Sequence, residues 1–194
     1  MTSKKNIKIM GISGLITLIL VLFDQITKYL AVINLKDKSP FEIIGNVFEL
    51  RYLENQSAAF GIDLVTLLQR LFKFSYFDYY PDIFLKFKML FFTIFTIAVV
   101  FLLIFLYYKI PNTGRFFYLN FSFILFIAGA IGNLIDRVIN NYVIDFFYFK
   151  LINFPIFNVA DIYVTVAAFL FIVLSFFYYK EEDFDIIFSK QLSK

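Results

Sequence analysis

Two aspartates in apolar surroundings are the residues of this sequence best suited to chemistry. Asp145 lies in the run VIDFF, and Asp161 ends the run FNVAD. A carboxyl group in such a setting must find a partner or take up a proton. Two carboxyl groups about 3 Å apart cannot both ionise, so they share a proton and supply one base and one acid, as in peptide hydrolysis. The alternative for Asp145 is a loop aspartate with its side chain in water.

Further polar residues stand inside apolar stretches at helical spacing. Asp24 and Lys28 are four residues apart, so on a helix they share a face and can neutralise each other. A structural ion pair and a catalytic role both fit this spacing. Asn133 and Arg137 repeat it, with Asp136 between them.

The small residues before Asn133, which are Ala128, Gly129 and Gly132, allow a neighbouring helix backbone to approach closely. Helix packing explains these small residues but not the polar residues after them. Asn158 and Asp161 are three apart, and both can face the same polar cluster. The alternative for either residue is a cap of the helix N-terminus, where asparagine and a carboxylate are favoured, and this alternative is strongest for Asn158.

Two absences narrow the chemistry. The chain has no histidine and no cysteine, which excludes a Ser-His-Asp triad, a histidine zinc helix and a thiol nucleophile. Acid–base work must then fall to carboxylates, lysine or tyrosine, and we expect neither a metal nor a cofactor. The net charge of +3 is spread along the chain without a basic block, so no nucleic-acid partner is expected.

The elements that position these residues are membrane helices. Hydrophobic residues make up 61% of the 194 residues and charged ones 17%, far from the balance of a soluble domain. Residues 89–108 carry no charge and are long enough to cross a bilayer. We predict one integral membrane domain over 1–194, with spans at about 9–33, 89–108, 116–137 and 157–179. A cleaved signal peptide is the alternative for the first span, but no small-x-small cleavage site follows it.

Orientation follows from the basic residues near the spans. Lys4, Lys5 and Lys8 precede the first span, and Lys109 and Arg115 lie between the second and third. Because cytoplasmic segments carry more lysine and arginine, both termini are predicted to be cytoplasmic. Two lysines just before the second span oppose this orientation. The polar residues of the spans then gather near the extracytoplasmic face.

The predicted extracytoplasmic segment, residues 34–88, has two patterned stretches. Phe48, Leu50 and Tyr52 alternate with polar or smaller residues, which predicts a short strand with one apolar face after a turn at Gly45-Asn46. Further on, leucines and a phenylalanine recur at helical spacing and predict an amphipathic interfacial helix. Its apolar positions are Leu64, Leu67, Leu68, Leu71 and Phe72.

Five strings occur in order along the chain: FDQITK (23–28), ENQSAAFG (54–61), AGAIGNLIDR (128–137), VIDFF (143–147) and FNVAD (157–161). Together they resemble the lipoprotein signal peptidases, the bacterial type II signal peptidase family. The resemblance implies a four-helix membrane fold with a small extracytoplasmic β-cradle. It also implies an aspartyl endopeptidase that removes the signal peptide of a prolipoprotein by cutting before a diacylglyceryl-modified cysteine.

Carried onto this sequence, the resemblance assigns the catalytic dyad to Asp145 and Asp161. It implies that other polar residues line or support the site: Asp24, Asn55, Asn133, Arg137 and Asn158. Lys28 and Asp136 fall in the same motifs, and we assign them a structural role. The expected partners are prolipoprotein substrates and membrane lipids, and the expected state is a monomer in the bacterial cytoplasmic membrane.

Three features depart from the family pattern. Ser57 and Ala128 stand where glycine is expected, and the stretch 62–88 is longer than usual. None of them touches the expected dyad. Without the resemblance, the alternative is a non-catalytic transporter or assembly factor with a buried polar network. A transporter places its site near the midplane of related halves, whereas the polar residues here gather toward one end.

Overall fold

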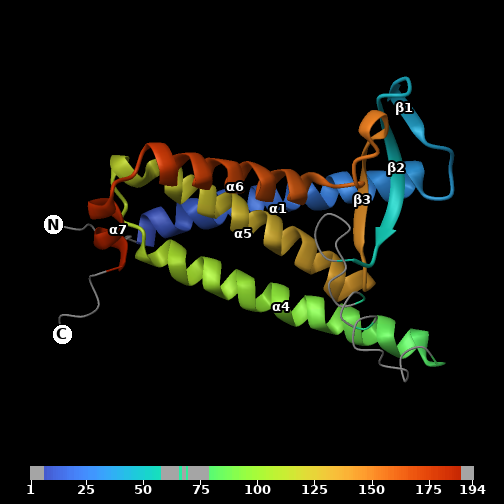
Figure 1. Cartoon of the computed structure of the whole chain (residues 1–194), viewed down its shortest axis with the longest axis horizontal. Helices are drawn as coiled ribbons and strands as arrows, with labels where there is room; N and C mark the ends of the chain where they lie inside the picture. The colour runs from blue at the N-terminus through green and yellow to red at the C-terminus, as the bar shows by residue number, and fades with distance from the viewer. Residues whose placement is uncertain (1–6, 58–65, 67–68, 70–78, 189–194) are drawn as a thin grey trace.

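Four long apolar helices form the body of the protein in a computed structural model, which describes residues 7–57, 66, 69 and 79–188 (Figure 1). The helices are α1 (Ile7–Leu35), α4 (Pro81–Lys109), α5 (Phe117–Asn140) and α6 (Val159–Phe177). Each has the length and hydropathy to cross a membrane, α5 together with the short 3-10 helix η2 (Gly114–Phe116) that precedes it. The predicted class, a helical membrane protein with four spans and a small sheet, is confirmed.

Helix α4 begins well before the uncharged stretch that marked the expected span. It starts at Pro81, and Asp82 follows in the first turn. Proline fits the first position of a helix and a carboxylate is favoured there, so this start has a local cause. The helix is therefore longer than the uncharged stretch 89–108, because charged residues near the end of a helix do not stop it.

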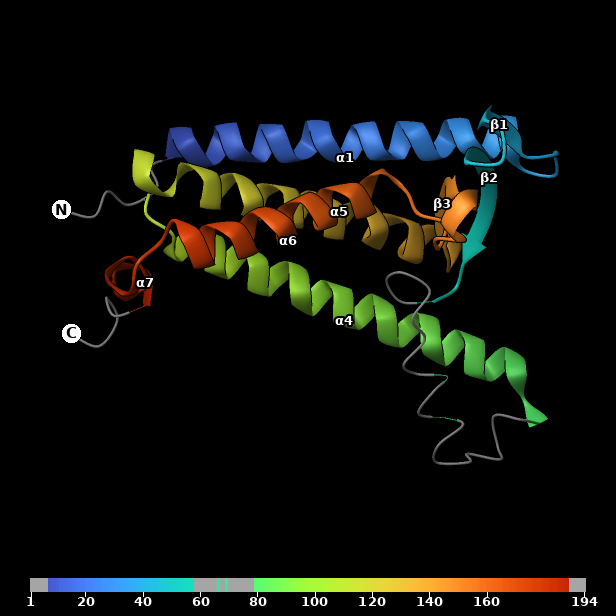
Figure 2. The same ribbon diagram turned by 45° about the horizontal axis from the view of Figure 1, so that its top comes forward.

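Helix α5 lies between the other helices, and small residues bring it close to two of them (Figure 2). A Cβ atom on Gly129 would lie 2.6 Å from the Ala160 carbonyl oxygen of α6. A Cβ atom on Gly132 would lie 2.6 Å from Asp24 Oδ2 of α1. Such contacts are too short for any side chain, so both glycines are required by the packing. The predicted packing role of the small residues is confirmed at these two positions.

Three antiparallel strands form a small sheet in the order β1-β2-β3. They are β1 (Phe41–Ile44), β2 (Phe48–Asn55) and β3 (Val143–Phe149), and the 3-10 helix η3 (Lys150–Ile152) follows β3. The predicted turn at Gly45-Asn46 joins β1 to β2, with Asn46 in the left-handed region at φ 54°. β2 pairs with β3 so that Leu53 faces Asp145 and Asn55 faces Val143. The sheet thereby brings the ENQ and VIDFF strings side by side.

The single apolar face predicted for β2 is wrong in one respect. Glu49, on the side assigned to solvent, is only 2% exposed. Its carboxylate lies 2.7 Å from Arg51 Nη2 and 3.4 Å from Lys150 Nζ. These two cations allow the acid to be covered, which a pattern of apolar residues does not register.

The sheet and the start of α6 lie at one end of the bundle (Figure 1). The first turn of α1 and the short helix α7 (Glu181–Phe188) lie at the other end. The apolar positions of the predicted interfacial helix lie outside the described residues.

Candidate active site

Asp145 is buried at the sheet end of the bundle and is held by two neutral amides. Strand β3 positions it, and its side chain is 1% exposed. Asn55 Nδ2 donates to Oδ2 at 2.7 Å, and Asn158 Nδ2 donates to Oδ1 at 2.7 Å. Asn55 is itself oriented, because its Oδ1 accepts the backbone N–H of Ser57 at 2.8 Å.

Asp161 lies in the first turn of α6 and is held in the same manner. Asn133 Nδ2 donates to Oδ1 at 2.9 Å, and the backbone N–H of Asn158 donates to Oδ2 at 3.1 Å. Among the described contacts, no hydrogen bond joins the carboxyl groups of Asp145 and Asp161 directly. The two groups are linked instead through the amides between them.

Asn158 is the main link, and it is fully buried. Its side chain accepts the backbone N–H of Asp161 at 3.0 Å, which together with the Asp161 bond to its own N–H forms a capping box. The same side chain donates to Asp145. The two interpretations of Asn158, helix cap and member of the polar cluster, are therefore both correct.

Both aspartates line one cavity of about 230 Å³ between the helices. Phe92 and Phe95 of α4 form an apolar wall, and Arg137 of α5 is the cationic residue in the lining. Arg137 Nη1 lies 3.4 Å from the Asn133 carbonyl oxygen.

Burial changes the protonation of Asp145. Its pKa is raised from 3.8 to about 7, chiefly because burial removes its contact with water and also because the negative charge of Asp161 lies nearby. The amides of Asn55 and Asn158 and the charge of Lys28 act against this rise. Near neutral pH Asp145 can therefore either hold or release a proton, as acid–base chemistry requires.

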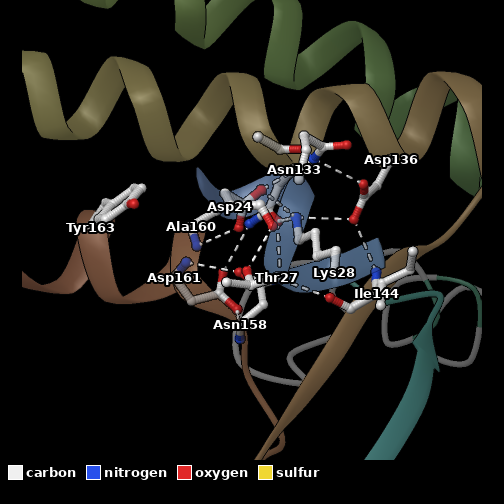
Figure 3. A network of polar contacts seen from close by, with 12 residues as sticks. Asp24, Thr27, Lys28, Asn133, Asp136, Ile144, Asn158, Ala160, Asp161 and Tyr163 are labelled. Atoms are coloured by element: carbon white, nitrogen blue, oxygen red, sulfur yellow. Dashed lines mark hydrogen bonds and ion pairs between the residues drawn. The ribbon is translucent and has the colours of Figure 1, made fainter. Parts of the chain in front are cut away.

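A second polar group, the ammonium cluster, lies next to Asn133, Asn158 and Asp161 (Figure 3). It consists of Asp24, Lys28 and Asp136. Lys28 Nζ lies 3.0 Å from Asp24 Oδ2, as the spacing predicted, and also 3.0 Å from Asp136 Oδ2. All three side chains are at most 2% exposed.

Two backbone N–H groups attach the ammonium cluster to the strand and helix that carry the aspartates. Ala160 N donates to Asp24 Oδ1 at 2.8 Å, and Ile144 N donates to Asp136 Oδ2 at 3.0 Å.

The structure brings together all nine of the residues singled out from the sequence, but it changes the use of some. The resemblance implied that Asn55, Asn133 and Asn158 line or support the site. Their described N–H bonds go mainly to the two aspartates, because buried carboxyl groups without a cation need every nearby donor.

Gln25 was missed by sequence analysis. Its Nε2 lies 3.1 Å from Asp24 Oδ2, 3.1 Å from the Gly132 carbonyl oxygen and 3.2 Å from Asp136 Oδ1. An amide beside Asp24 inside an apolar span was the available signal. Among the described residues, no three acidic, histidine or cysteine side chains group as ligands of a metal ion.

Comparisons with known proteins agree with this arrangement. The family described as "Signal peptidase (SPase) II" matches residues 16–177. The lipoprotein signal peptidase of Caldanaerobacter subterraneus subsp. tengcongensis is 38% identical over 76% of this chain and 84% of its own length. That of Clostridioides difficile is 38% identical over 84% of this chain and 94% of its own length.

A solved structure of a bacterial membrane enzyme has the same fold. It superposes with a TM-score of 0.67 at 31% identity, over 92% of this chain and 99% of the other. Sequence and fold thus agree with these proteins over most of the chain, which belongs to the signal peptidase II family.

Proposed function

We propose that this membrane peptidase removes signal peptides from diacylglyceryl-modified prolipoproteins by cutting before the lipidated cysteine, with Asp145 and Asp161 as its catalytic dyad. The observation that carries the proposal is the pair of carboxyl groups in one cavity, held by neutral amides rather than by cations. Such a pair keeps a proton near neutral pH and can offer one acid and one base. A transporter or assembly factor explains the buried network but gives no role to two carboxyl groups that, among the described residues, take part in no ion pair.

The reaction proceeds through water. The ionised carboxylate removes a proton from a water molecule, and the resulting hydroxide attacks the scissile carbonyl carbon. The protonated carboxyl group donates its proton to the carbonyl oxygen. As the tetrahedral intermediate collapses, the carboxyl group that took the proton from water gives it to the leaving amine, and one hydroxyl of the intermediate returns its proton to the other carboxylate, so that the pair again holds one proton. Because the two groups titrate together, the resting proton belongs to the pair.

The neighbouring residues have separate roles in this mechanism. Asn55, Asn133 and Asn158 hold the dyad carboxyl groups in place. Arg137 lines the cavity and stabilises negative charge that develops on the substrate. Asp24 supports the site from behind through the backbone of Ala160.

We further propose that both termini are cytoplasmic and that the dyad lies near the extracytoplasmic face. Lys8 in the first turn of α1, Lys109 at the end of α4 and Arg115 in η2 support this orientation. They lie at the end of the bundle opposite the sheet, and positive charge favours the cytoplasmic side.

The substrate enters laterally from the lipid, with its signal helix among the spans and its acyl chains against the apolar surface of the helices. Phe91, Ile94 and Phe101 of α4 are each at least 46% exposed and suit contact with lipid. A monomer suffices, since one chain supplies both carboxyl groups and all of their described partners.

The test follows cleavage of a lipidated and a non-lipidated form of one precursor in membranes. Asp145→Asn and Asp161→Asn should each abolish cleavage of the lipidated form, while the exposed Asp82→Asn, the same change in the first turn of α4, should cleave at the wild-type rate. Wild-type cleavage by either dyad variant would remove that residue from the mechanism. Equal processing of both precursor forms by the wild type would contradict the specificity for lipidated substrate.

A further inference from the structure

We infer that Lys28 is a positioning residue for the dyad, which sets the spacing of Asp145 and Asp161 through Asp24, Asp136 and Asn133. The inference rests on the proposed function and adds a role for a residue that sequence analysis made merely structural. Lys28 does not reach the reacting atoms itself. It acts through three contacts, each of which leads to one of the two aspartates.

The Lys28 ammonium has three N–H donors and three acceptors. These are Asp24 Oδ2 at 3.0 Å, Asp136 Oδ2 at 3.0 Å and Asn133 Oδ1 at 2.9 Å. Lys28 is 1% exposed, so its contacts are internal. One charge on α1 therefore determines where two carboxylates and one amide lie.

The two carboxylates carry this geometry to the dyad through the backbone. Asp24 accepts the N–H of Ala160, the residue before Asp161. Asp136 accepts the N–H of Ile144, the residue before Asp145. The ammonium thus ties together the peptide groups that precede the two dyad residues, one at the start of α6 and one in β3 (Figure 3). Moving either carboxylate moves the attached aspartate.

The third contact sets the orientation of an amide. Asn133 Oδ1 accepts from Lys28 and, at 3.1 Å, from Asn158 Nδ2. With the oxygen so engaged, Asn133 Nδ2 points to Asp161. The reversed amide would place its N–H₂ group against an ammonium and its oxygen against a carboxylate, and both contacts are repulsive.

Charge gives the inference a second consequence. The ionisable groups around Lys28 are Asp24 and, across the packed elements, Asp136, Arg137, Asp145 and Asp161. The ammonium lowers the pKa of Asp145, so its loss raises the pH at which the pair gives up its proton. A residue that only stabilises the fold would leave the pH profile of the folded enzyme unchanged.

The experiment measures cleavage of a diacylglyceryl-modified precursor by Lys28→Met, Lys28→Arg and the control Lys38→Met. Lys38 follows α1, and its described contact is the Ile33 carbonyl oxygen, so the control should match the wild type. Thermal unfolding in detergent reports the folded fraction of each variant. For folded Lys28→Met we expect kcat about 100-fold lower, KM within about twofold and a pH optimum about one unit higher. Lys28→Arg should recover part of kcat.

Removing Lys28 alone leaves two buried carboxylates without their cation, which can prevent folding. The double variant Lys28→Met/Asp136→Asn removes one charge of each sign and keeps an oxygen acceptor for Ile144 N, so it serves as the second test. We expect it to fold and still to show the low kcat and shifted pH optimum.

Wild-type kcat and pH optimum in either folded variant would overturn the inference. A loss that follows the folded fraction alone, with an unchanged pH optimum, would also overturn it. Failure of the proposed function differs from both outcomes, since the wild type itself would then leave the lipidated precursor uncut.

Discussion

Two pairs of buried aspartates lie at the same end of this protein, and they have different hydrogen-bonding partners. Asp24 and Asp136 share the ammonium of Lys28. Asp145 and Asp161 receive N–H bonds from asparagine side chains and a backbone amide. A cation removes the need for a proton, whereas neutral amides do not. Burial of a carboxylate therefore does not by itself indicate acid–base chemistry. Whether the buried group retains a proton depends on whether its partner is a cation or a neutral amide.

The two pairs of aspartates also have different places in the fold. The ammonium cluster joins α1, α5, β3 and α6 through short contacts. The amide-held pair faces a cavity and leaves room for a substrate. A rigid ionic cluster behind a protonatable pair would be a form of preorganisation, since the cluster holds the geometry that the proposed reaction uses.

Removing one acid from each pair should have the largest effects and tests directly whether the two pairs have different roles. Asp145→Asn should lower cleavage by roughly 10³-fold or more, with a thermal midpoint at pH 8 within about 5 °C of wild type. Asp136→Asn should instead lower the free energy of unfolding by about 3 kcal/mol, because it removes one of the two buried ion pairs of Lys28 and weakens the acceptor of the Ile144 N–H. Cleavage assays and thermal unfolding on the same preparations distinguish the two. A stable, inactive Asp136→Asn protein beside an unfolded Asp145→Asn protein would reverse the assignment.

The pH dependence of stability should show that Asp145 carries a proton in the folded protein. The pKa of Asp145 rises from 3.8 to about 7 on folding, so the folded protein holds this proton more tightly than the unfolded chain does. Stability is then lost as pH rises from about 4 to about 7, by an amount on the order of 3 kcal/mol. Unfolding midpoints across this range should fall in the wild type and in Asp82→Asn. In Asp145→Asn the fall should be smaller, and an unchanged slope there would assign the effect to another group.

Close packing around Asp24 provides a smaller test. Gly132→Ala would place a Cβ atom 2.6 Å from Asp24 Oδ2 and 3.2 Å from the Ala160 Cβ atom. We expect a loss of about 2 kcal/mol in the free energy of unfolding. Gly14→Ala on α1 has nothing within 4 Å of the added atom, and it should be neutral or stabilising by up to about 1 kcal/mol. Equal stability of the two variants would show that α1 and α5 can move apart at Gly132 with little cost in free energy.

A neutral hydrogen bond between α5 and α6 should matter least. Ser122 Oγ donates to the Ala167 carbonyl oxygen at 2.8 Å, and both residues are fully buried. Ser122→Ala should cost about 0.6 kcal/mol and leave the cleavage rate unchanged. A thermal shift larger than that of Gly132→Ala would contradict the order of effects proposed here.

Sequence analysis predicted the features that local chemistry determines. Four spans followed from composition, and the Asp24–Lys28 pair followed from spacing. The turn at Gly45-Asn46 followed from the residue types that favour turns. The capping role of Asn158 was one of two alternatives, and the structure has both.

The features that sequence analysis missed depend on tertiary contacts. The strand Val143–Phe149 is buried over its first four residues and shows no alternation that would identify it. The roles of Ala160 and Ile144 lie in their backbone N–H groups, which residue type does not report. Gln25 gained its role only when Asp136 of another helix came within reach.

The dual role of Asn158 links helix fraying to inactivation. The Asn158 side chain that caps the first turn of α6 also donates a hydrogen bond to Asp145. Opening of that turn should therefore also break a hydrogen bond to one residue of the proposed dyad. Hydrogen exchange at the Asp161 backbone N–H should therefore report the fraction of molecules with an assembled centre. Any compound that slows this exchange from the neighbouring cavity would be recognisable as an active-site ligand before any substrate is cut.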